Sequence, residues 1–423
     1  MKFSISSVRI VDSDRDIFGT VSVENGKIAS VQEEPVSTPP KKLLLPGMVD
    51  PHVHFRDPGA AGFQTAEDFA SGSAAAAAGG VTTVFDMPNT QPPVFSAENL
   101  AQKRTIVSAK SLVRWGLFFG AGEHNLPEIS AVKNVPGIKL YANDTTGHLR
   151  VSQEKTWRDI FSLGRRVVVH AEGETFVHLA RVWAEIGFPC PLHLAHTARA
   201  IEVSALRDLK KKTDRISAEV APHHLFFTAE DVTDGFLRMK PELGLKSDQE
   251  ALWQGIADGT IDCAGSDHAP HPVSAKKTNT PAFGVPGVQH IFPLLFSAWL
   301  ERGWDLQNLV RFTSQRAAEI FHLSPRGQIA PGVPADLALF DLTAPQKVSD
   351  QTLFSRCGWT PYGDFSLPCV SQTWVGGIEV FCDRKITAGD WRADEERFLP
   401  GLSQKSLDGS SAGSSPQKRA GSS

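Results

Sequence analysis

Two histidines placed two residues apart carry the strongest chemical signal in the sequence. His52 and His54 stand in the stretch Asp50-Pro51-His52-Val53-His54, at the end of an apolar run. Residues two apart in an extended strand point to the same face, so both imidazoles can converge on one ion. Converging imidazoles suit zinc or a similar transition metal. The pair taken alone could equally be ordinary surface or core histidines, so the choice depends on further candidates.

Further candidate ligands follow other apolar runs of the chain. His170 and His196 each close such a run, and Asp267 follows a third. A single histidine at a strand end is usually structural. Four histidines and one aspartate, all placed at the ends of strand-like runs, instead favour a metal centre built from several strands.

Lys139 is unusual because it lies inside the apolar stretch Gly137-Ile138-Lys139-Leu140-Tyr141. A buried ammonium group is costly unless it is paired. One interpretation is a salt bridge inside the fold. The other is that the neutral amine takes up carbon dioxide and becomes a carbamate, an anion able to bridge two metals. The residues alone leave both interpretations open.

The elements that must position these residues form a repeating pattern. Strand-like apolar runs lie at 43–53, 81–87, 114–120, 137–142, 166–171, 191–195, 216–221 and 261–264. Helix-like stretches between most of them lie at 69–78, 96–110, 153–163, 175–186, 198–212 and 247–257. Ser247 begins a sequence typical of a capping box, Ser-Asp-Gln-Glu. Eight strand–helix units predict an α/β fold, a (β/α)8 TIM barrel whose active site lies past the carboxyl ends of its strands.

The two ends of the chain differ in character from the barrel at 47–326. Segments 1–46 and 327–402 contain alternating strands and hairpin signals such as Asn25-Gly26. We predict that both segments together form one small β-sandwich domain beside the barrel. Residues 403–423 are rich in Ser and Gly and cannot bury enough apolar surface to fold, which predicts a disordered tail.

Charge, cysteine content and hydropathy exclude several classes of protein. The net charge of −4 gives no attraction to nucleic acid or to anionic membranes. The five widely spaced cysteines do not suggest a disulfide framework. The sequence contains no run of 18 apolar residues, and its N-terminus shows no secretory signal pattern. We therefore expect a cytoplasmic protein with no nucleic-acid or membrane partner.

Short motifs spread over residues 46–341 identify a family resemblance. They are PGMVDPHVH (46–54), DMPNT (86–90), IKLY (138–141), HAE (170–172), LAH (194–196), EVAPHHL (219–225), SDHAPH (266–271) and GVPADL (332–337). Together they resemble the dihydroorotases of the cyclic amidohydrolase superfamily, in the class that includes the dihydroorotase domain of the animal multifunctional pyrimidine protein.

The resemblance implies two metal ions per subunit, usually zinc. The ligands it implies are His52, His54 and Asp267 for the first metal, His170 and His196 for the second, and Lys139, carboxylated, as the bridge between them. Glu219 matches a residue that helps to bind an extra zinc in some relatives. A neighbouring ligand position is occupied here by Ala195, which argues against a third metal.

Specificity within the superfamily depends on other positions, of which Arg56 is the most informative. Its planar guanidinium suits a carboxylate, which dihydroorotate carries and allantoin and simple hydantoins lack. The resemblance implies that Asn89 and His271 help to clamp the same group. A pairing of Arg56 with Asp57 or Asp68 is the alternative.

Five more positions match substrate-contacting segments of the relatives. Lys240 stands where relatives carry an Arg or Asn that touches the substrate. Phe283 and Gly284 resemble the substrate-contacting loop after the eighth strand. Thr145 and Thr146 fall where a mobile loop covers the substrate in relatives.

The implied reaction is the reversible hydrolysis of (S)-dihydroorotate to N-carbamoyl-L-aspartate, a step of pyrimidine (UMP) biosynthesis. A hydroxide between the two metals would attack the ring carbonyl, with Asp267 acting as general base and then as general acid. Two alternatives stay open: a related hydantoinase or allantoinase, and a catalytically silent partner of aspartate transcarbamoylase. The complete ligand set argues against the silent partner. Homodimer formation and association with a transcarbamoylase are left open by the sequence.

Overall fold

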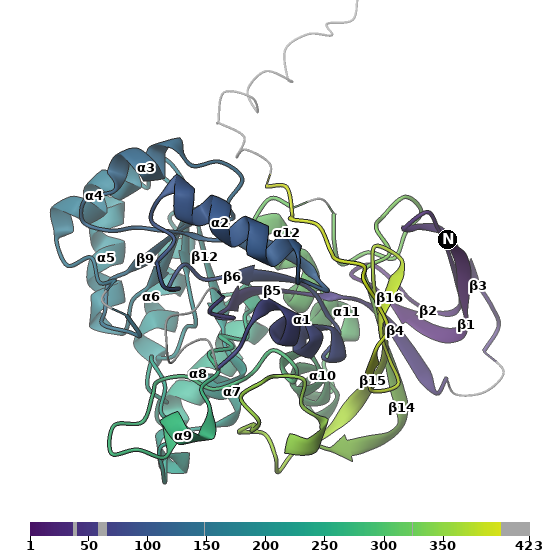
Figure 1. Ribbon diagram of the computed structural model, residues 1–423. Helices are drawn as coiled ribbons and strands as arrows, with labels where there is room; N and C mark the ends of the chain where they lie inside the picture. Colours follow the sequence, from purple (N-terminus) through teal and green to yellow (C-terminus); the bar gives the residue numbers. More distant parts are fainter. Residues whose placement is uncertain (37–39, 58–65, 148, 324, 399–423) are drawn as a thin grey trace, which may run out of the picture.

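A barrel of parallel strands and a mainly antiparallel sheet lie side by side in the protein (Figure 1). The computed structural model describes the chain except for residues 37–39, 58–65, 148, 324 and 399–423. The predicted tail at 403–423 therefore lies outside the described residues. No helix in the described part of the chain is long and apolar enough to cross a membrane.

Eight strand positions build the barrel, which confirms the predicted fold class. The strands are β5 (Met48–Val53), β6 (Val81–Asp86), β7 (Arg114–Leu117), β8 (Phe119–Gly120), β9 (Ile138–Tyr141), β10 (Val167–His170), β11 (Leu192–Leu194), β12 (Ile216–Val220) and β13 (Cys263–Ala264). β7 pairs with β6 and β8 pairs with β9, so these two short strands share one position, interrupted at Phe118. A parallel bridge from Val53 to His268 joins the first strand to the segment after the last.

The predicted strand at 43–53 is wrong as a single element, because the chain changes sheets at Gly47. β4 (Lys42–Pro46) pairs with the small sheet, and β5 begins the barrel at Met48. A Cβ atom on Gly47 would lie 2.2 Å from the side chain of Thr82. Only glycine fits this close crossing between the two sheets.

Helices surround the barrel. They are α1 (Phe69–Ala78), α2 (Ala97–Ser108), α3 (Leu126–Ala131), α4 (Glu154–Ser162), α5 (Glu174–Glu185), α6 (Ala200–Lys210), α7 (Pro222–Phe226), α8 (Lys246–Ala257), α9 (Val273–Lys276), α10 (Ile291–Arg302), α11 (Leu306–Val310) and α12 (Arg316–Ile320). The six expected stretches correspond to α1, α2, α4, α5, α6 and α8 to within a few residues, whereas the other helices were not predicted. The predicted cap of α8 at Ser247 is wrong. The helix begins one residue earlier, and the side chain of Asp248 instead accepts the backbone N–H of Leu245 at 2.9 Å.

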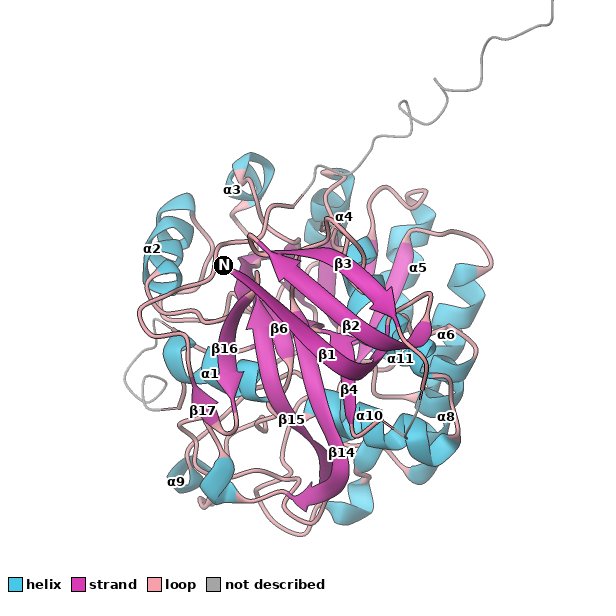
Figure 2. Cartoon of the chain, turned by 90° about the vertical axis from the view of Figure 1, so that its right-hand side faces the viewer, coloured by secondary structure: helices cyan, strands magenta, loops and turns pink. Residues whose placement is uncertain are grey.

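Strands from both chain ends form the second sheet (Figure 2). Its order is β17-β16-β15-β14-β4-β1-β2-β3, with β1 (Lys2–Val11), β2 (Asp16–Glu24), β3 (Lys27–Glu33), β14 (Leu337–Lys347), β15 (Ser366–Val375), β16 (Ile378–Cys382) and β17 (Lys385–Ile386). The rings of Phe3 and Trp374 stack 6.0 Å apart, although their strands are not neighbours in the sheet. Both chain ends thus contribute to one continuous sheet, which curves enough to bring side chains of β1 and β15 together.

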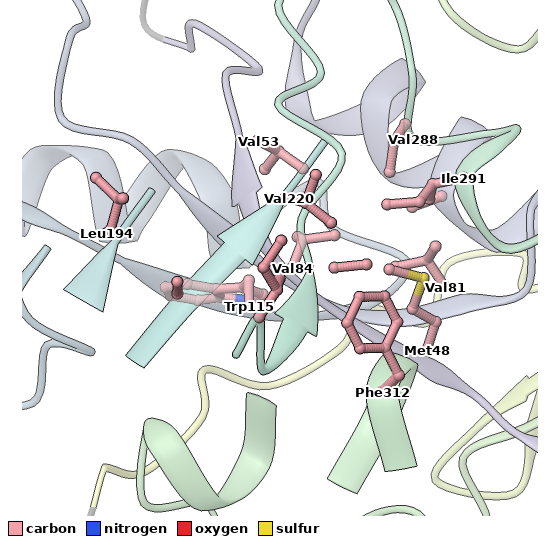
Figure 3. Close-up of a cluster of buried hydrophobic side chains, with 14 of the residues drawn as sticks. Met48, Val53, Val81, Val84, Trp115, Leu194, Val220, Val288, Ile291 and Phe312 are labelled. Carbon is pink, nitrogen blue, oxygen red and sulfur yellow. The ribbon is translucent and has the colours of Figure 1, made fainter. Parts of the chain in front are cut away.

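The main core fills the space between the barrel strands and the surrounding elements. Figure 3 shows Met48, Val81, Val84, Trp115 and Phe312 within it, all buried. Every residue of β5, β6, β9 and β10 is buried, as expected for parallel strands covered on both faces. Polar side chains on these strands are therefore held in a low-dielectric interior, which sets their chemistry.

Candidate active site

Three side chains meet where β5 ends and where the chain leaves β13. The Nε2 atoms of His52 and His54 lie 3.2 Å apart. The Oδ1 atom of Asp267 lies 3.3 Å from the first and 3.1 Å from the second. All three residues are buried, and their ligand atoms are close enough together to hold one metal ion.

Hydrogen bonds behind the two imidazoles aim them at this point. His54 Nδ1 donates to Asn89 Oδ1 at 2.7 Å, and His52 Nδ1 donates to Glu219. Each bond places the proton on Nδ1 and leaves the Nε2 lone pair facing the site. Burial alone would raise the pKa of Glu219, but His52 and His193 hold that pKa below its usual value. Glu219 is therefore an anionic support for His52.

A second group of candidate metal-ligand residues lies on β9, at the end of β10 and just after β11. His170 Nδ1 and His196 Nε2 lie 2.7 Å apart, and His170 Nε2 donates to Glu172 at 3.1 Å. Lys139 Nζ is buried with no hydrogen-bond partner among the described residues. Burial lowers the pKa of Lys139 to about 8, so a neutral amine is accessible. The residues of both groups fit metal binding, because imidazole nitrogens and a carboxylate line one cavity together with the amine of Lys139.

The backbone is strained at three residues that line this cavity. Arg56, His196 and Asp267 adopt left-handed φ angles of 58°, 37° and 45°. Such angles cost free energy in residues other than glycine and concentrate at functional sites. The surrounding fold therefore imposes the direction in which these side chains point.

Arg56 brings a positive charge into the same cavity as the candidate metal ligands. Its side chain is only 2% exposed, and burial lowers its pKa to about 10, which still leaves it protonated at neutral pH. Of its two predicted alternative partners, Asp57 forms an ion pair with Lys110 at 2.6 Å and Asp68 forms one with Arg356 at 2.8 Å.

The remaining predicted residues fall into two groups. Those that line the cavity are Asn89, Thr145, Thr146, Lys240, Phe283 and Gly284. His271 is buried just outside the lining, where its Nε2 donates to the carbonyl of Phe283 at 2.9 Å. Burial lowers the pKa of His271 to about 3, so the ring is neutral at neutral pH and, with Nε2 donating to Phe283, has no N–H left for a substrate carboxylate.

Tyr141 is a cavity residue to which the sequence analysis gave no role. Its hydroxyl is buried without a hydrogen-bond partner among the described residues. Burial raises its pKa, so the hydroxyl stays a donor at neutral pH. Tyr141 lies two residues after Lys139 on β9, and the same period of two that linked His52 to His54 could have identified it.

Replacing Glu219 by glutamine should weaken metal binding by about 10- to 100-fold, the usual cost of losing a partner of a ligating histidine. One Glu219 oxygen accepts from His52 and the other from His193 Nε2 at 3.2 Å, whereas an amide can accept on one side only. Zinc titration of the metal-free protein measures the change. Glu319→Gln on the surface is the control. An unchanged zinc affinity in Glu219→Gln would contradict this supporting role.

Comparison with known proteins places the chain in a family. The model of the amidohydrolase family matches residues 43–380. The chain is 31% identical to the dihydroorotase of Enterococcus faecalis over 86% of this chain and 94% of that protein. It is 32% identical to the dihydroorotase of Halobacterium salinarum over 82% and 89%, respectively. It also matches the multifunctional protein CAD of Squalus acanthias at 35% identity, but spans only 14% of that protein.

Solved structures support the same fold at lower sequence identity. The L-hydantoinase from Arthrobacter aurescens superposes with a TM-score of 0.84 at 22% identity, over 93% of this chain and 99% of that one. The dihydropyrimidinase from Brevibacillus agri gives 0.83 at 23% identity, over 95% and 100%. At these sequence identities the structural similarity supports the fold alone. The family match and the sequence identities show that the chain belongs to the amidohydrolase family and, within it, to the dihydroorotase group.

Proposed function

We propose that the chain is a zinc-dependent cyclic amidase that interconverts (S)-dihydroorotate and N-carbamoyl-L-aspartate in pyrimidine (UMP) biosynthesis. The observation that carries the proposal is the buried Arg56 guanidinium in the cavity that holds the candidate metal ligands. A charged guanidinium in a low-dielectric cavity selects a carboxylate-bearing substrate. Dihydroorotate carries that group next to its cyclic amide, whereas allantoin and simple hydantoins do not.

His52, His54 and Asp267 would hold one zinc ion, and His170 and His196 a second. Lys139 would add an anionic ligand as a carbamate: its neutral amine would attack carbon dioxide, forming an N–C bond while the nitrogen loses a proton. This modification turns an unpartnered buried amine into an anion. Bound metal lowers the pKa of water enough to supply a nucleophile near neutral pH.

Asp267 is proposed to move the proton. During hydrolysis its carboxylate accepts a proton from the attacking water and delivers it to the ring nitrogen as the amide C–N bond breaks. In the biosynthetic direction these transfers reverse, and the ring closes with loss of water. Its contacts with both His52 and His54 keep the carboxylate close to the point where the reaction would occur.

The substrate carboxylate would be clamped by Arg56, with help from the amide Nδ2 of Asn89. His271 would help indirectly, by holding the carbonyl of Phe283, because its neutral ring donates from Nε2 to that carbonyl and has no second N–H for the carboxylate. Asn89 Oδ1 already accepts from His54, so only its amide donor can serve the substrate. Lys240, Phe283 and Gly284 would line the same cavity. The loop with Thr145 and Thr146 would cover the cavity, since both threonines line it.

The rival functions differ in their expected substrates. A hydantoinase or allantoinase would need no carboxylate clamp, and a silent partner of aspartate transcarbamoylase would need no metal ligands. We favour the dihydroorotase because this chain has both features. We propose a cytoplasmic enzyme, and leave a homodimer and an association with a transcarbamoylase as questions for mass measurement.

The deciding experiment compares dihydroorotate, dihydrouracil and allantoin side by side, with metal content measured on the same sample. We expect kcat/KM for dihydroorotate to exceed the other two by at least about a hundredfold, because a buried polar site rejects analogues that leave it unpaired. Removal of metal should abolish turnover, and zinc with bicarbonate should restore it. A preference for dihydrouracil or allantoin would indicate the related amidases. Absence of both bound metal and turnover would indicate the silent partner.

A further inference from the structure

Lys276 is a buried cation that the proposed reaction does not use. It ends α9, its side chain is only 1% exposed, and it does not line the cavity. Its Nζ donates to three backbone carbonyls, those of Arg238 at 2.9 Å, Ala282 at 2.7 Å and Gly284 at 2.9 Å. An ammonium group has three donors, so every one of them is engaged with backbone.

Two of these carbonyls flank Phe283, which lines the cavity together with Gly284. The carbonyl of Phe283 itself accepts from His271 Nε2 at 2.9 Å. Three successive carbonyls, at 282, 283 and 284, are therefore held by two buried side chains. This arrangement fixes the backbone of the loop along one side of the cavity.

The loop has little room for any other shape. Gly284 has a φ of +125°, and a Cβ atom there would lie 2.4 Å from the carbonyl oxygen of Ala269. The N–H of Gly284 also donates to Arg238 O at 3.0 Å, the carbonyl that Lys276 binds as well. The indole N–H of Trp359 donates to the carbonyl of His271 at 2.7 Å, and Lys276 Nζ lies 5.7 Å from the centre of the Trp359 ring. Lys276 thus lies at the centre of a network of hydrogen bonds to the backbone of this loop.

We propose that Lys276 is a positioning residue that holds residues 282–284 in the shape that binds the substrate. The role for binding rests on the proposed function, since it takes this cavity as the dihydroorotate site. Loss of the ammonium removes the donor to the buried carbonyls of Ala282 and Gly284 and one of the two donors to the carbonyl of Arg238, which favours loop shapes that open toward water. Because Lys276 is outside the cavity, its loss should weaken substrate binding and spare the chemical step.

The test replaces Lys276 by methionine, which keeps most of the length of the side chain and removes all three donors. The adjacent Lys277→Met is the matched control, because Lys277 is exposed. We expect KM for dihydroorotate to rise about tenfold in Lys276→Met, with kcat within about threefold and metal content unchanged. Hydrogen exchange should become faster in the 277–290 segment alone. Lys277→Met should match the parent in every measurement.

Each outcome is decisive for Lys276. An unchanged KM, an unchanged exchange rate at 277–290, or a fall in kcat with loss of metal would overturn the positioning role. If Lys276→Met does not fold, Lys276→Gln replaces it, with two donors kept and an expected rise in KM of about threefold. A parent protein that does not turn over dihydroorotate would refute the proposed function instead. Hydrogen exchange would then still decide whether Lys276 anchors the loop.

Discussion

Replacing Asp267 by asparagine should lower kcat for dihydroorotate by about a thousandfold or more, in both directions of the reaction. Asparagine keeps the shape of the side chain and an oxygen near His52 and His54, but it cannot accept a proton. Burial by itself would raise the pKa of Asp267, yet His52, His54 and His196 together hold it well below its usual value. The carboxylate is therefore ionised at neutral pH and able to act as a base. Steady-state kinetics at saturating substrate measure the effect.

Asp267 is also a proposed metal ligand, so its two roles must be separated. Kinetics at saturating zinc, with metal content measured on the same sample, distinguish a loss of proton transfer from a loss of metal. Asp258→Asn is the control, because Asp258 forms a surface ion pair with Arg207 at 2.6 Å. An Asp267→Asn variant that keeps its metal and a kcat within tenfold of the parent would rule out the proton-transfer role.

The barrel was predictable because its strands are buried on both faces. Such strands appear in the sequence as continuous apolar runs, so the polar residues that follow each run are easily recognised. This contrast identified His170, His196 and Asp267, and the period of two added His52 and His54. The same logic failed at Gly47, where one apolar run serves two different sheets. An apolar run alone does not tell which sheet a strand joins.

Side-chain partners across the fold could not be predicted from the sequence. Asn89 was expected to bind the substrate, but its carbonyl oxygen supports His54 from 35 positions away in the chain. His271 was expected to face the substrate, but its Nε2 holds the carbonyl of Phe283. Both contacts depend on how separate loops meet above the barrel. Local spacing therefore located these residues near the site without fixing which atom serves which purpose.

The backbone around Arg56 is fixed before any substrate arrives. The preceding N–H, that of Phe55, donates to Asp86 Oδ1 at 2.7 Å, and Asp86 forms a buried ion pair with Lys103. Arg56 itself adopts a left-handed φ of 58°. A side chain aimed by such supports loses little conformational freedom on binding a carboxylate, which increases the affinity that the contact can provide.

Replacing Arg56 by methionine should therefore lower kcat/KM for dihydroorotate by about 100- to 1,000-fold, mainly through KM, as expected for loss of a buried, charge-assisted contact. The same variant should change kcat/KM for dihydrouracil by less than about threefold, because that substrate has no carboxylate to lose. Arg181→Met, on the exposed side of α5, is the control. Equal losses for both substrates would mean that Arg56 supports the cavity itself. A loss confined to dihydroorotate would make the carboxylate clamp the source of the substrate specificity.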